Sequence, residues 1–137
     1  MKRRFEELSV GQTAQRTVKF TAEAVEAFAR LTGDCNPVHL DDAYAAGTLF
    51  KKRIVHGMLV AGLFSAIIGM DLPGEGSVYL GQELKFVKPV YIGDQVTATV
   101  CIVEIMQEKK RILLETVAVN QNGEEVLTGR ATVKFLG

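Results

Sequence analysis

The segment that most constrains the fold is residues 57–70, GMLVAGLFSAIIGM, in which Ser65 is the only polar side chain. The segment is too short to cross a bilayer, which needs about 20 apolar residues. A helix that is apolar all round is normally buried on every side. The sequence therefore predicts a helix over 57–70 that the rest of the chain wraps with a large apolar surface.

The second half of the chain is expected to supply that surface as strands. The predicted strands span residues 78–87, 95–106, 111–119 and 125–135, and the second of them is rich in Val, Thr and Ile, as strands usually are. The last one alternates between apolar and polar residues, which indicates one buried and one wet face. The Asn122–Gly123 pair predicts a type I′ hairpin. These features predict an α+β fold, a curved antiparallel sheet wrapped around a central apolar helix.

Two further helices are expected before the apolar one. Thr21 is a good N-cap and Gly33 a typical C-terminal stop, so a helix is predicted between them. Asp41 can cap a short helix over residues 41–47. A chain of 137 residues suits one domain, so we expect a single domain over 1–137.

Composition excludes several classes of protein. Sixteen Lys and Arg balance sixteen Asp and Glu, so no nucleic-acid partner is expected, and weak charge repulsion leaves self-association open. Cys35 and Cys101 are too few for a disulfide framework and lie outside any CxxC pair, so no zinc site is expected. The N-terminus lacks the apolar core of a signal peptide. We therefore expect a cytoplasmic protein with no membrane partner.

The segment GDCNPVH, residues 33–39, is the best candidate for chemistry. It follows a predicted helix stop, and Pro37 restricts the backbone of Asn36, so we expect a loop that holds Asp34 and His39 in a fixed relation. An Asp and a His held together can share proton transfers near neutral pH. An Asx-turn beside a hydrogen-bonded loop histidine is the commoner use of these residue types.

The start of the apolar helix, IVHGM at residues 54–58, is the second candidate. Helix N-termini present free N–H groups, and Gly57 has no side chain to keep a ligand away. Such groups can polarise a carbonyl oxygen. A glycine needed only for close packing is the alternative, and His56 is expected to cap or pack. Ser65 lies outside any GxSxG motif, so a nucleophilic serine is not expected.

The basic run Lys51, Lys52 and Arg53 precedes this glycine. Most such runs form a solvated face, but this one lies where it could meet phosphate groups.

The run FARLTGDCNPVH, residues 28–39, with Ala45 beyond it, resembles the hydratase 2 motif of the MaoC-like family of (R)-specific enoyl-CoA hydratases. The resemblance continues through residues 53–59, RIVHGML, and 63–65, LFS, into the segments 76–82 and 86–94. It covers nearly the whole chain, with no departure at the motif positions.

The resemblance implies a hot-dog fold and a set of site residues. Asp34 and His39 would be the catalytic pair, the Gly57 N–H would receive the thioester oxygen, and Asn36 and Ser65 would support the site. It also implies a homodimer whose sheets join, with coenzyme A entering between protomers. Coenzyme A would then be part of the substrate, and no separate cofactor or metal is expected.

The expected activity is hydration of a trans-2-enoyl-CoA to an (R)-3-hydroxyacyl-CoA, and its reversal. A hot-dog acyl-CoA thioesterase would use the same glycine but attack the carbonyl carbon. A non-catalytic acyl-CoA-binding or assembly subunit is the other alternative. Acyl chain length, the choice between coenzyme A and acyl carrier protein, and the pathway are left open by the sequence.

Overall fold

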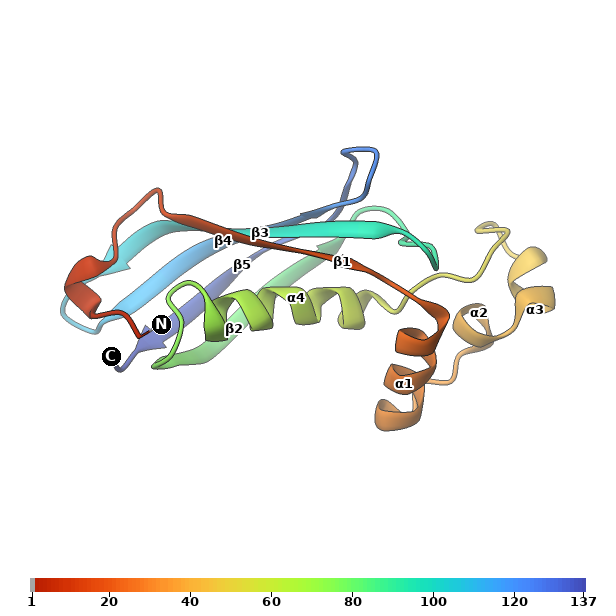
Figure 1. The fold of residues 1–137 in the computed structure, drawn as a ribbon, viewed down its shortest axis with the longest axis horizontal. Helices are drawn as coiled ribbons and strands as arrows, with labels where there is room; N and C mark the ends of the chain where they lie inside the picture. The colour runs from red at the N-terminus through yellow and green to blue at the C-terminus, as the bar shows by residue number, and fades with distance from the viewer. Residues whose placement is uncertain (1) are drawn as a thin grey trace.

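A computed structural model describes residues 2–137, which form a five-stranded antiparallel sheet packed against a long helix (Figure 1). The strands have the spatial order β1-β3-β4-β5-β2. The predicted α+β class, with a curved sheet against an apolar helix, is confirmed. In chain order the elements are η1 (Phe5–Glu7), β1 (Thr13–Lys19), α1 (Ala22–Thr32), α2 (Pro37–Leu40), α3 (Asp42–Ala46), α4 (Gly57–Met70), β2 (Ser77–Phe86), β3 (Gln95–Met106), β4 (Arg111–Val119) and β5 (Glu125–Phe135).

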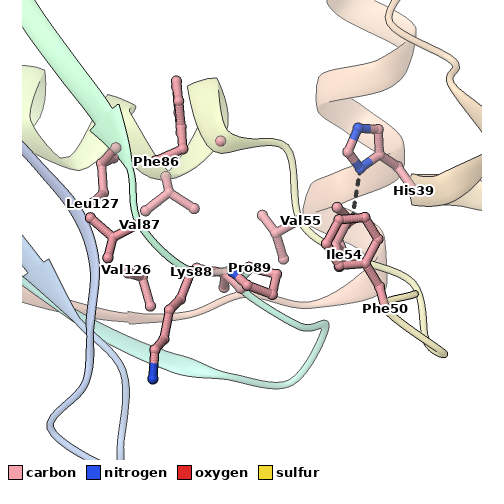
Figure 2. A pocket seen from close by; sticks show the side chains of 13 residues that line it. His39, Phe50, Ile54, Val55, Phe86, Val87, Lys88, Pro89, Val126 and Leu127 are labelled. Atoms are coloured by element: carbon pink, nitrogen blue, oxygen red, sulfur yellow. Dashed lines mark hydrogen bonds between the residues drawn. The ribbon is translucent and has the colours of Figure 1, made fainter. Parts of the chain in front are cut away.

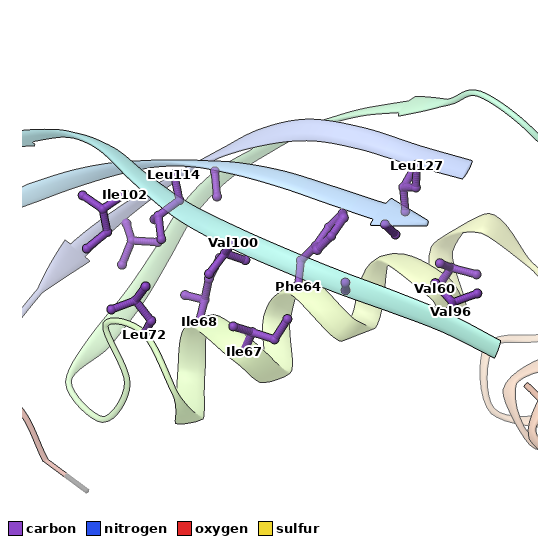
Figure 3. Packing of buried hydrophobic residues seen from close by; sticks show 14 of the residues in the cluster. Val60, Phe64, Ile67, Ile68, Leu72, Val96, Val100, Ile102, Leu114 and Leu127 are labelled. Atoms are coloured by element: carbon purple, nitrogen blue, oxygen red, sulfur yellow. The ribbon is translucent and has the colours of Figure 1, made fainter. Parts of the chain in front are cut away.

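The hydrophobic core lies between α4 and the inner face of the sheet (Figure 3). Alternate residues of β3 and β4 are buried, as expected for strands with one face on a core. The helix contributes a stripe at helical spacing, made of Val60, Phe64, Ile67 and Ile68, each at most 1% exposed. One sheet face and one helix stripe therefore account for most of the buried apolar surface.

The opposite side of α4 is open, so the prediction of burial on every side is wrong for the single chain. Met58 is 59% exposed and Met70 66% exposed, and Gly62, Ser65 and Gly69 between them are also exposed. Met58, Gly62, Ser65 and Gly69 share one helix face because they recur every three or four positions. The curved sheet reaches only one side of the helix, which leaves this apolar face without a cover inside the chain.

Strand β1 was missed by the sequence analysis. Its sequence, TAQRTVK, has no apolar alternation, and all but one of its residues are exposed. It forms an edge of the sheet by antiparallel pairing with β3, from Thr13 opposite Cys101 to Lys19 opposite Gln95. Backbone hydrogen bonds rather than side-chain burial define this strand, so a pattern of hydrophobicity could not reveal it.

The chain between β4 and β5 turns back as predicted, but the turn type differs. A type I′ turn needs positive φ at both central residues. Gly123 has φ 77°, whereas Asn122 is not among the residues with positive φ. The Asn120 side-chain oxygen instead accepts the N–H groups of Asn122 and Glu124, each at 3.0 Å. The side chain of Asn120 thus closes a longer loop.

The predicted helix ends are confirmed in α1 and α3. The Thr21 hydroxyl oxygen accepts the Ala24 N–H at 3.2 Å, and Gly33 ends α1 with φ 84°. The Asp41 carboxylate caps α3 through the Tyr44 N–H. Helices α1 to α3 lie together beyond the N-terminal end of α4, away from the chain termini (Figure 1).

The two cysteines are free, and within residues 2–137 no helix is long and apolar enough to span a membrane.

Candidate active site

His39 lies on the short helix α2, so the expectation that all of residues 33–39 form a loop is partly wrong. Asn36 caps this helix, because its side-chain oxygen accepts the Val38 N–H at 3.3 Å, and Pro37 occupies the first helical position. The Asn36 backbone itself is non-helical, with ψ 126°, as expected for a residue before proline. Asn36 and Pro37, which suggested a rigid loop, therefore begin a short helix that holds His39 in place.

The His39 ring is 8% exposed and has one nitrogen fixed by the backbone. Its Nδ1 lies 2.7 Å from the carbonyl oxygen of Ile54 (Figure 2). A carbonyl oxygen only accepts hydrogen bonds, so Nδ1 carries the proton and Nε2 of the neutral ring has a free lone pair. In the neutral ring, Nε2 is thus the nitrogen that can accept a proton.

Asp34 and His56 complete a cluster with His39. The rings of His39 and His56 are stacked, with centroids 3.8 Å apart and planes 25° apart. Nε2 of His56 lies 3.0 Å from the backbone carbonyl oxygen of Asp34. The structure thus brings together the predicted pair, five positions apart in the sequence, and adds a second histidine that the sequence analysis had assigned to capping or packing.

The cluster also has the spacing of a possible metal site. The Asp34 carboxylate and the two imidazoles offer one ligand atom each, all within 4.8 Å of one another. A metal ion bound to His39 Nε2 would remove the lone pair that accepts a proton. The two uses of this nitrogen therefore exclude each other.

The start of α4 faces the same cavity. The His56 carbonyl accepts the N–H groups of Leu59 and Val60, so those of Gly57 and Met58 precede the first hydrogen bonds of the helix. A cavity of about 230 Å³, here called the polar cavity, is lined by Asp34, His39, His56, Gly57, Met58 and Phe86. A helix N-terminus and an Asp–His pair thus share one cavity.

A second cavity of about 350 Å³, here called the apolar cavity, adjoins it (Figure 2). His39, Gly57 and Phe86 line both cavities. The other walls are mostly apolar and include Phe50, Val55, Val60, Pro89, Val126 and Leu127. The Phe86 ring packs directly on Gly57, where a Cβ atom would overlap it. His39, Gly57 and Phe86 therefore lie at the junction between the two cavities.

Lys51 and Lys52 line a third cavity of about 330 Å³, together with Asp42 and Tyr91. Lys52 Nζ lies 4.7 Å from the centre of the Tyr91 ring. Both lysines are exposed, so their charges are available to an anion.

Arg53 also lines this third cavity but turns inward. Its side chain is only 14% exposed, its Nε donates to the His39 carbonyl oxygen at 2.7 Å, and its Nη2 lies 3.7 Å from a Glu26 carboxylate oxygen. These contacts tie the end of α2 to α1.

Ser65 lies apart from the other predicted site residues. It is on the exposed face of α4 and lines neither the polar nor the apolar cavity. Eight residues separate it from Gly57, a rise of about 12 Å along a helix. Within one chain, the structure does not bring Ser65 to Asp34 and His39.

Comparison with known proteins agrees with this geometry. Residues 6–124 match the family model described as MaoC like domain. The chain belongs to the MaoC-like family. An (R)-specific enoyl-CoA hydratase of Aeromonas caviae is 49% identical over 93% of this chain and 96% of its own length. A 3-hydroxybutyryl-CoA dehydratase of Methylorubrum extorquens is 44% identical over 95% of this chain and 82% of its own length.

The solved structure of the A. caviae (R)-hydratase involved in PHA biosynthesis superposes on this MaoC-like chain with a TM-score of 0.93. The match covers 95% of this chain and 98% of that one, at 48% identity. The predicted hot-dog fold and the predicted family are therefore confirmed.

Three residues that line the polar cavity were missed as site residues, His56, Met58 and Phe86. A signal for His56 existed, because it directly precedes the glycine that begins α4. Phe86 gave no such signal, since its place at the end of an edge strand shows only when β2 is paired with β5.

Proposed function

We propose that this MaoC-like chain hydrates trans-2-enoyl-CoA to (R)-3-hydroxyacyl-CoA and catalyses the reverse dehydration. The observation that carries the proposal is the polar cavity, which places the Asp34–His39 pair beside the N-terminus of α4. The names of the two relatives, one an (R)-specific hydratase and one a dehydratase, support both the reaction and its reversal.

The thioester carbonyl binds at the start of α4 in this proposal. Its oxygen accepts the Gly57 N–H, and the positive end of the helix dipole stabilises the negative charge that develops on it. This interaction draws electron density from the C2=C3 bond and makes C3 electrophilic. The adjoining apolar cavity then receives the acyl chain, because its walls are largely aliphatic and aromatic.

Asp34 and His39 handle one water molecule. The pair takes a proton from the water, whose oxygen forms the new bond to C3, and then delivers a proton to C2. His39 Nε2 can accept that proton because Nδ1 is committed to Ile54. Atoms balance with one water added and no electrons transferred, so the step needs no redox cofactor. We propose that His39 Nε2 accepts the proton of water rather than binding a metal ion. Asn36 supports the pair by capping α2.

The test is turnover of crotonyl-CoA and longer trans-2-enoyl-CoAs, with the chirality of the product determined. We expect (R)-3-hydroxyacyl-CoA, no release of free thiol, and the same rate after treatment with EDTA. Release of free thiol would identify a thioesterase instead. Binding of the substrate without turnover would identify a non-catalytic subunit, and loss of activity with EDTA would contradict the metal-free mechanism.

We propose that the protein works as a homodimer. β2 is an edge strand with exposed apolar side chains, including Val78, Leu80 and Phe86, and the exposed face of α4 is also uncovered. Natural proteins usually cover or pair such an edge.

We expect light scattering at micromolar concentration to give twice the chain mass of 15.0 kDa. Leu80→Glu should shift the protein toward monomer, because it places a charge on the apolar edge. Val10→Glu, a change at another exposed apolar residue outside this edge and α4, is the control. A monomer with full activity in the unaltered protein would contradict the proposal.

We also propose that Lys51 and Lys52 bind the phosphates of coenzyme A. Lys51→Glu and Lys52→Glu should each raise KM for an acyl-CoA about twofold to fivefold with little change in kcat, because an exposed ion pair contributes up to ~1 kcal/mol. Added salt should shrink the difference. Lys109→Glu, in the exposed β3–β4 turn, is the matched control.

A substrate without the nucleotide separates a direct contact from a general charge effect. For an N-acetylcysteamine thioester, both lysine variants should keep the KM of the unaltered protein. An equal rise in KM for both substrates would contradict phosphate binding at these lysines.

A further inference from the structure

We propose that His56 is a positioning residue that aligns both halves of the site, the Asp34–His39 pair and the Gly57 N–H. This inference rests on the proposed hydratase function. His56 is not assigned a proton-transfer step; it acts by holding three other groups in place.

The side chain of His56 is almost completely enclosed, at 2% exposure. One face of its ring stacks on His39 at 3.8 Å, and the Phe28 ring lies 4.7 Å away at a tilt of 53°. An imidazole packed by a second histidine and a phenylalanine cannot turn freely, so its hydrogen-bonding direction is fixed.

The His56 ring directs its Nε2 toward the backbone of Asp34. Nε2 of His56 lies 3.0 Å from the Asp34 carbonyl oxygen, so Nε2 carries the proton and donates. The other hydrogen bonds of the exposed Asp34 are local. Its N–H donates to the Thr32 hydroxyl oxygen at 3.2 Å, and its carboxylate accepts the Asn36 N–H at 3.4 Å. The His56 hydrogen bond is therefore the contact that joins the Asp34 backbone to a distant part of the chain.

The position of His56 in the sequence couples this contact to α4. His56 is the N-cap residue of the helix, and its carbonyl oxygen accepts the first helical N–H groups. The peptide bond between His56 and Gly57 contains the N–H proposed to bind the thioester oxygen. A shift of the His56 backbone would consequently move that N–H, the Asp34 backbone and the ring against which His39 packs.

The geometry assigns opposite neutral tautomers to the two rings. His39 carries its proton on Nδ1, toward Ile54, and His56 carries its proton on Nε2, toward Asp34. Nδ1 of His56 is buried and has no hydrogen-bond partner within residues 2–137. This nitrogen is therefore an acceptor without a partner. That is expected if His56 acts only through the hydrogen bond that its Nε2–H donates.

Two substitutions distinguish the effect of the His56–Asp34 hydrogen bond from the effect of packing by the ring. His56→Gln keeps an N–H donor at a similar reach, whereas His56→Phe keeps a flat ring and removes the donor. We expect His56→Phe to lower kcat at least about tenfold with KM within about threefold, and His56→Gln to recover most of that loss. Ile67→Val, a buried change in α4 outside both cavities, is the control for lost stability.

Turnover is measured per folded molecule with an enoyl-CoA substrate, and ¹⁵N spectra of the histidine rings are recorded on the unaltered protein. The expected spectra show His39 as the Nδ1–H tautomer and His56 as the Nε2–H tautomer. A proton on Nδ1 of His56, an unchanged kcat in His56→Phe, or equal losses in His56→Phe and His56→Gln would each overturn the inference. Absence of hydration by the unaltered protein would instead reject the proposed function, and the ring spectra would still test the geometry.

Discussion

Asp34→Asn and His39→Gln should each lower kcat for enoyl-CoA hydration by about 10²–10⁴, the usual contribution of a general acid or base. Asn keeps the shape of the Asp34 side chain but cannot take a proton from water. Gln at position 39 lacks the lone pair of Nε2. Steady-state kinetics on crotonyl-CoA measures both effects, and KM should change far less than kcat because the change removes a proton acceptor rather than a binding surface.

The two variants differ in their expected effect on folding. Asp34 is exposed, so its substitution should leave thermal unfolding nearly unchanged. His39 is buried and bonded to Ile54, so His39→Gln should melt earlier, and its turnover must be expressed per folded molecule. Asp41→Asn is the matched control, since Asn also caps helices well and Asp41 lies outside both cavities. Full activity in either Asp34→Asn or His39→Gln would reject the proposed mechanism.

Most of the helices and strands could be predicted from the sequence because their apolar side chains face the core and their polar side chains face water. The bounds of β3, β4 and β5 agree with the predicted strands, and α4 spans the predicted helix. Each of these segments buries a regular set of side chains, so its hydrophobic period reports its conformation. The caps of α1 and α3 were predictable for a different reason, since Thr21 and Asp41 bond locally to their own helices.

The features that were missed depend on contacts between distant segments. β1 exists through backbone pairing with β3, and its exposed side chains carry no pattern. The open face of α4 follows from how far the sheet curves, which composition does not state. The hairpin before β5 took a different turn because Asn120, outside the two residues of the motif, caps the loop.

The candidate site likewise combines a local feature, which the sequence predicted, with tertiary contacts, which it did not. Asp34 and His39 lie five positions apart in one segment, so their juxtaposition could be predicted from a single motif. The apposition of that motif and the start of α4 is a tertiary contact, made by the hydrogen bonds from the His39 ring to Ile54 and from the His56 ring to Asp34. The inward turn of Arg53 is likewise tertiary, because a basic run alone does not show which of its members pairs with Glu26.

Gly57→Val should lower kcat by at least about 10², comparable to the loss of one oxyanion-hole donor. A side chain at this position would overlap the Phe86 ring and obstruct the place where the thioester oxygen meets the helix N-terminus. Gly57→Ala should act in the same direction with a smaller effect. If Gly57 serves only close packing, the same changes should lower the unfolding temperature while each folded molecule keeps full turnover.

A change at Phe86 distinguishes a catalytic role of the Gly57 N–H from a packing role of Gly57. The Phe86 ring is 56% exposed and can move, so Phe86→Ala opens space for a side chain at position 57. In the Gly57→Ala, Phe86→Ala double variant, thermal stability should recover if the clash with Phe86 caused its loss, because the two changes then couple strongly. Turnover should stay below that of Phe86→Ala alone, since the added methyl group still crowds the thioester oxygen. Recovery of turnover to the level of Phe86→Ala would show that Gly57 only accommodates the ring, and the Gly57 N–H would lose its proposed role.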